Sequence, residues 1–146
     1  MEANERYAYA CGAIDAFCEM VAAGVKQLAL SHPCDTRAQR DALLPFCETV
    51  CAKRGLLFYA EDHLLLTDLF PPSANAGKYV VMFFASPAVY EAYQSLKRRK
   101  AALVKAGEYK GEARRGIAEA FGLLLSYSDE AIARMIAQNV AHKQEP

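Results

Sequence analysis

The sequence predicts an α/β (or α+β) protein in which a small mixed β-sheet of three to four strands is covered by helices. Three observations support this fold class. Short runs of β-forming residues occur within the first 85 residues. Helical periodicity dominates the C-terminal half. Glycine, proline or a capping residue marks most boundaries. The 146 residues fit a single domain, 1–146, and we expect 141–146 to form a frayed tail.

The first helix is predicted over residues 4–23, where apolar residues recur at steps of three and four. Gly24 is expected to end it, because glycine adopts the left-handed conformation without a Cβ clash. Residues 25–31 could continue this helix or form a short strand. The glycine before them and Ser31-His32-Pro33 after them favour the strand.

A second helix is predicted to begin at Thr36, because Gln39 three residues later completes a capping-box pattern. Gly55 is expected to end this helix. Pro45 falls inside it, where proline loses a hydrogen bond and clashes one turn back at a cost of ~3 kcal/mol. We therefore expect a kink or a break, with Pro45 at the first position of the second piece.

Two strands, 56–60 and 64–70, are predicted to form a tight hairpin around the polar tripeptide 61–63. Residues 71–77 then form a loop, and 79–85 give a third run of β-forming residues. If 25–31 is a strand, residues 25–60 form a strand–helix–strand unit, and the two strands of such a unit are parallel.

Three helices complete the chain, over 87–106, over 111–125 and after a predicted cap at Ser128. Acidic residues follow Ser128 directly, as the helix dipole favours. The expected order of elements is α-β-α-β-β-β-α-α-α.

The stretch LALSHPCDT, residues 28–36, holds the densest cluster of reactive side chains. Ligands gather beyond the carboxyl ends of parallel strands. There, a carboxylate of Glu61 or Asp62 could orient the imidazole of His32 as a general base, with Cys34 as the nucleophile. The alternative is structural: a turn before a capped helix, and a solvated hairpin tip that ends in His63.

Asp68 lies inside an apolar run, on the strand face that Leu66 and Phe70 would share. A buried carboxylate needs a partner, and we expect a cross-strand pair with Lys78. The predicted ligand-binding residues are His32, Cys34, Glu61, Asp62, His63, Asp68 and Lys78. No catalytic residue is assigned, and no cofactor is expected.

The five cysteines are expected to be reduced, because no secretory signal opens the chain. Four of them, Cys11, Cys18, Cys47 and Cys51, fall on apolar helix stripes and are predicted to be core residues. Their spacing does not match that of a structural zinc site, so no metal is expected.

The net charge is zero, but residues 1–70 carry a charge of −4 and residues 71–146 a charge of +4. A neutral total argues against a nucleic-acid partner. No apolar run approaches the ~20 residues that a spanning helix needs, so we expect no membrane partner and a cytoplasmic location.

These observations favour a non-enzymatic protein that binds a small polar or anionic ligand or a protein partner. The alternative is a small enzyme that uses His32 with Glu61 or Asp62, and possibly Cys34. A second alternative is polyanion binding through 97–115, where basic residues and tyrosines interleave. A homo-oligomer such as a dimer is expected, because a small sheet leaves an edge to cover.

Overall fold

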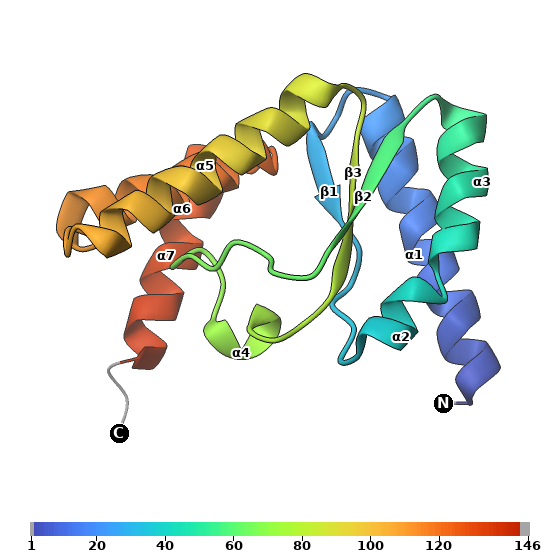
Figure 1. Ribbon diagram of the computed structural model, residues 1–146, viewed down its shortest axis with the longest axis horizontal. Coiled ribbons are helices and arrows are strands. Elements are labelled where there is room, and N and C mark those ends of the chain that lie inside the picture. The colour runs from blue at the N-terminus through green and yellow to red at the C-terminus, as the bar shows by residue number, and fades with distance from the viewer. Residues whose placement is uncertain (1, 144–146) are drawn as a thin grey trace. The chain divides into compact units, whose positions relative to one another are not determined.

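The structure is a computed structural model that describes residues 2–143 (Figure 1). Three strands of these residues form one antiparallel sheet. The strands are β1 (Leu28–Leu30), β2 (Leu57–Glu61) and β3 (Val80–Phe84), in the order β1-β3-β2. The predicted fold class is confirmed, with helices and a sheet in the expected order and a helical C-terminal half. Residues 25–31 contribute a strand, as the flanking boundary signals favoured.

The strand–helix–strand unit predicted over 25–60 is split by the central strand. In the sheet, β1 and β2 run in the same direction, but β3 lies between them and pairs antiparallel with both. The expected parallel neighbours are therefore wrong. The reason is that a later segment of the chain, Val80–Phe84, has taken the position between them.

The residue contacts divide the chain into two units. The first combines the chain up to Leu64 with Gly77–Pro87, and the second combines Leu65–Ala76 with the chain from Ala88 onward. The prediction of one domain over 1–146 stays a prediction.

The first unit also contains α1 (Ala3–Ala22), α2 (Arg37–Asp41) and α3 (Leu44–Arg54). The predicted helix signals are confirmed here. Gly24 follows α1 at φ +77°, and Thr36 and Gln39 form both hydrogen bonds of the capping box. The predicted break separates α2 from α3, with Pro45 at the second position of α3 rather than the first.

The core of the first unit lies between the sheet and the helix pair α1 and α3, which cover the same face of the sheet (Figure 1). Val81 and Phe83 from β3 are fully buried there. The predicted core cysteines are confirmed: Cys11, Cys18, Cys47 and Cys51 are all buried in this cluster. A small thiol lets the two helix backbones pack closely over the sheet.

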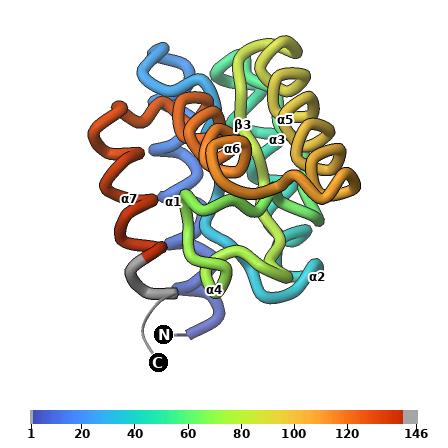
Figure 2. Tube along the Cα trace, turned by 90° about the vertical axis from the view of Figure 1, so that its left-hand side faces the viewer, coloured from blue at the N-terminus to red at the C-terminus, as the bar shows by residue number. Residues whose placement is uncertain are grey.

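The second unit contains α4 (Pro72–Asn75), α5 (Pro87–Lys105), α6 (Gly111–Leu124) and α7 (Asp129–Lys143), and α6 packs against α7 (Figure 2). The predicted cap is confirmed, because the hydroxyl of Ser128 accepts a hydrogen bond from the backbone N–H of Ala131 at 3.1 Å. Of the tail expected over 141–146, residues up to Lys143 continue α7, and 144–146 lie outside the described residues.

The strand predicted over 64–70 is wrong, because this segment forms no ladder with β2. Its backbone is bonded by side chains of the helices instead. Leu65 donates its N–H to the hydroxyl of Tyr93 at 3.0 Å. The amide of Asn139 donates to the carbonyls of Asp68 and Phe70 at 2.9 and 3.1 Å. These bonds satisfy the backbone groups that a hairpin with β2 would have paired. In the sheet, β2 pairs with β3 instead.

Candidate functional site

A cavity of about 560 Å³ lies in the first unit, among α1, the segment that follows β1, and α2. We call it the α1–α2 cavity. Most of its wall is apolar, and the polar residues stand among tyrosines and alanines. It is lined by Ala3, Arg6, Tyr7, Tyr9, Ala10, Ile14, Ser31, His32, Pro33, Cys34, Asp35, Gln39, Ala42 and Leu43. Residues 31–35 of the predicted cluster therefore line this cavity.

The backbone after β1 fixes the position of His32. Cys34 forms an isolated bridge with Tyr79, with N–H···O distances of 2.8 and 2.9 Å, so the segment stays attached to the edge of the sheet. The imidazole of His32 stacks on Tyr9 at 6.1 Å between ring centroids and meets Phe17 edge-on at 5.7 Å. Both aromatic rings belong to α1. The imidazole is thereby held against α1 at the wall of the cavity.

The thiol of Cys34 is not arranged as the nucleophile of a cysteine–histidine pair. Its Sγ donates to the backbone carbonyl of His32 at 3.9 Å, rather than to a nitrogen of the imidazole ring. Burial raises the pKa of the Cys34 thiol, and the positive charge of Arg40 opposes this only in part. The group is therefore a neutral thiol at pH 7, whereas nucleophilic cysteines need a lowered pKa.

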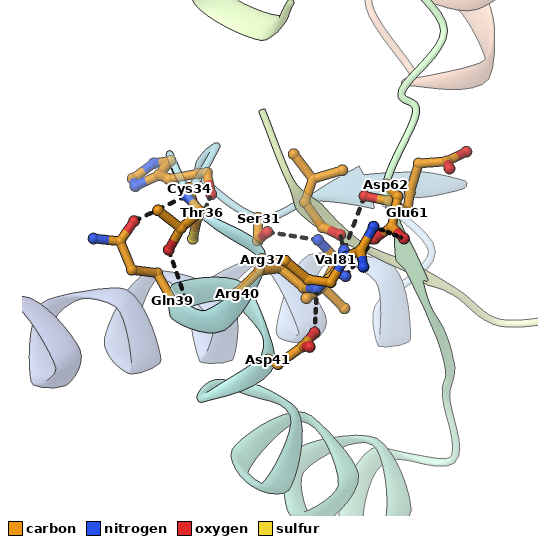
Figure 3. A network of polar contacts seen from close by, with 12 residues as sticks. Ser31, Cys34, Thr36, Arg37, Gln39, Arg40, Asp41, Glu61, Asp62 and Val81 are labelled. Atoms are coloured by element: carbon orange, nitrogen blue, oxygen red, sulfur yellow. Dashed lines mark hydrogen bonds and ion pairs between the residues drawn. The ribbon is translucent and has the colours of Figure 1, made fainter. Parts of the chain in front are cut away.

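Arg40 of α2, which the sequence did not single out, organises the polar groups beyond β2 (Figure 3). Its side chain is only 3% exposed. One terminal nitrogen donates to the carbonyls of Glu61 and Val80 at 2.9 and 3.1 Å. The other donates to Asp62 at 2.5 Å, and Nε donates to Asp41 at 2.8 Å. Arg40 thus joins the end of β2 to the start of β3.

Asp62 and its neighbours serve this network rather than the cavity. Hydrogen bonding to Arg40 lowers the pKa of the Asp62 carboxyl. Arg37 adds a second ion pair to Asp62 at 3.2 Å. The side chain of Glu61 accepts from the backbone N–H of His63 at 3.0 Å. Of the predicted site residues, His32 and Cys34 therefore come together at the cavity. Glu61 ends β2 and Asp62 and His63 follow it, on the side of β3 away from β1.

The predicted pair between Asp68 and Lys78 is wrong. Lys78 forms an ion pair with Asp35, and Asp68 binds Arg114 with two hydrogen bonds of 2.6 and 2.8 Å. The two residues could face each other only across a hairpin, and residues 64–70 form no strand. The Lys78 ammonium lowers the pKa of the Asp35 carboxyl.

One signal in the sequence could have identified Arg40. It stands three residues before Leu43, which precedes Cys47 by four, so it falls on the apolar stripe of the single helix that the sequence predicts from Thr36 to Gly55. A charged residue at such a position is almost never fully buried unless it is paired.

Among residues 2–143, no group of three or more histidine, cysteine, aspartate or glutamate side chains is placed to hold a metal ion. No helix in this part of the chain has the length and apolar character needed to cross a bilayer. Comparisons with protein-family models, with curated proteins and with solved structures gave no match to this chain.

Proposed function

We propose that the protein binds a small molecule with an apolar body and an anionic or hydrogen-bond-accepting end, and that it does so in the α1–α2 cavity. The observation that carries this proposal is the size and lining of that cavity, about 560 Å³ with a largely apolar wall. Ligand sites in proteins are typically ~300–1,000 Å³, mostly apolar, with a few polar groups that fix orientation.

The polar groups of the cavity favour an acceptor at one end of the ligand. Asp35 is neutralised by its ion pair with Lys78. Arg6 forms no ion pair with another described residue, and its guanidinium carries up to five N–H donors. The Gln39 side chain uses its oxygen in the capping box, which leaves its NH₂ group to donate. These donors suit a carboxylate, a sulfonate or a carbonyl group.

The contacts favour binding over the alternative of a small enzyme. Catalysis by His32 with Glu61 or Asp62 would need one of these carboxylates beside the imidazole. Asp62 is instead engaged by two arginines, and the contacts of the ring are aromatic. The Cys34 thiol is neutral, so it supplies no thiolate.

We further expect the protein to act in the cytoplasm, where reducing conditions suit its five free cysteines. A homodimer through the outer edge of β1 or β2 would cover the unpaired backbone groups of that strand.

The proposal is tested with 8-anilinonaphthalene-1-sulfonate, a fluorescent probe with an apolar body and an anionic end. Native protein is expected to give a saturable rise in fluorescence. Ala42→Trp places an indole in the cavity and should weaken binding by at least about tenfold, a loss of ~1.4 kcal/mol. Ala38→Trp is the matched control, because Ala38 is an exposed residue of the same short helix that does not line the cavity.

Equal affinity of the two variants and the native protein would refute the proposal. Both tryptophan variants must keep a cooperative thermal unfolding transition, because the probe also binds molten globules. Near-ultraviolet circular dichroism cannot serve for these two variants, because the added indole itself changes the spectrum of a chain without tryptophan. As a second measurement, Arg6→Gln should weaken binding of the sulfonate without changing the spectrum.

A further inference from the structure

A second, smaller cavity lies inside the second unit, between the segment 66–72 and the helices α5 and α6. Its volume is about 90 Å³. We call it the Lys100–Arg114 cavity, after the two basic residues in its wall. It shares no residue with the α1–α2 cavity.

Both cations lie against a single aromatic ring. Lys100 places its Nζ 5.1 Å from the ring centre of Tyr109, and the guanidinium carbon of Arg114 lies 5.0 Å from the same centre. Lys100 also donates to the carbonyl of Leu66 at 2.6 Å. These contacts hold two like charges close together at the wall of a small cavity.

The two cations share the single carboxylate of Asp68, so the charged side chains that line this cavity keep a net positive charge. This carboxylate accepts from Nε and Nη2 of Arg114 at 2.6 and 2.8 Å. Lys100 donates to a neutral carbonyl and forms no ion pair with any carboxylate of the described residues. Burial and the charge of Arg114 lower the pKa of the Lys100 ammonium, and the Asp68 carboxylate opposes this only in part. A further anion beside Lys100 would therefore relieve the remaining cost.

Three residues that line this cavity, Lys100, Arg114 and Thr67, have donors that the bonds above do not use. An ammonium carries three N–H donors and a guanidinium five, and the bonds above use one and two of them. Thr67 accepts from Leu69 at 3.1 Å through its hydroxyl oxygen, which leaves the hydroxyl hydrogen to donate. A volume of about 90 Å³ has room for one small tetrahedral oxyanion.

We propose that the Lys100–Arg114 cavity binds a single phosphate-sized oxyanion, either free inorganic phosphate or the end of a small phosphate monoester. Lys100 and Arg114 donate to its oxygens, and Asp68 orients the guanidinium. The volume fits one phosphate group better than a continuous nucleic-acid backbone. This inference is independent of the ligand proposed for the α1–α2 cavity.

The test is a titration of ¹⁵N-labelled full-length protein with inorganic phosphate, followed by amide chemical shifts, with ionic strength held constant by sodium chloride. Saturable shifts are expected for the amides of Leu66, Thr67 and Tyr109. Lys100→Gln should weaken binding by at least about tenfold, because it removes a charge-assisted bond. Lys105→Gln, an exposed lysine on the same helix, should leave the affinity unchanged.

Non-saturating shifts, shifts spread over exposed lysines, or equal affinity of the two variants would each overturn the proposal. Should Lys100→Gln fail to fold, the location of the shifts in the native protein still decides the matter. A parallel titration with glycerol 3-phosphate separates the two sources of the ligand. Tighter binding than that of inorganic phosphate assigns a monoester, and weaker binding assigns the free ion. Ala42→Trp, which blocks the other cavity, should not change either titration.

Discussion

Replacement of Arg40 by methionine should destabilise the protein by about 3–5 kcal/mol. The substitution leaves the carbonyls of Glu61 and Val80 without their donor, and an unsatisfied buried acceptor costs about 1–3 kcal/mol. Asp62 also loses its shortest bond. The two carbonyls together account for about 2–6 kcal/mol. The side chain of Asp62 is 33% exposed, so water can solvate its carboxylate and its loss adds little.

Arg37→Met is the matched control for this prediction. Arg37 also pairs with Asp62, but its side chain is 60% exposed, against 3% for Arg40. Exposed ion pairs contribute about 0–1 kcal/mol, so the control should lose less than about 1 kcal/mol. The assay is urea unfolding followed by far-ultraviolet circular dichroism. A loss below about 1.5 kcal/mol for Arg40→Met, or equal losses for the two variants, would refute the argument from burial.

Three further predictions follow from single contacts. Gly122→Ala should lower the free energy of unfolding by about 1–3 kcal/mol, because the added Cβ would lie 2.5 Å from the side chain of Ile132. Gly116→Ala, on the same helix but with open space around it, should raise that free energy by about 0.5–1 kcal/mol, and thermal unfolding compares the two variants. Stability should fall as the pH drops below about 4, because the pKa of Asp62 is lower in the folded than in the unfolded protein. The contribution of Asp62 to stability is therefore present above the unfolded pKa of ~3.9 and is lost as the pH falls through the folded pKa. A urea midpoint that stays flat from pH 6 to pH 3 would contradict this. Cys34 should react with iodoacetamide at pH 7 more slowly than a free thiol such as that of glutathione, because the pKa of its thiol is raised. Mass spectrometry of timed samples measures the rate, and a faster reaction than that of glutathione would speak against this prediction.

The helices could be predicted from the sequence because their signals are local. The capping box at Thr36, the glycines after α1 and α3, and Ser128 before α7 each act within four residues. The buried cysteines follow from the same periodicity. The cluster around His32 was found as well, because the turn that ends β1 gathers its polar residues in consecutive positions.

The segment 64–70 could not be predicted in this way. Leu64, Leu65 and Leu69 are buried, as in a strand. The backbone partners of the segment, however, are side chains that follow it by some 30 to 70 residues. Asp68 likewise finds Arg114 on α6 rather than a neighbour across a turn. Spacing along a single sequence carries no information about such distant partners. The same holds for the insertion of β3 between β1 and β2.

The central place of β3 has a consequence for synthesis of the chain. Every strand pairing in the sheet includes Val80–Phe84, and α1, α3 and β2 precede it. At a translation rate of about 5–20 residues per second, roughly 1–5 s separate the completion of β2 from that of β3. During that interval the nascent chain exposes two strands with nothing to pair and two helices with no sheet to cover. That interval is when a chaperone would find its binding surface on this protein.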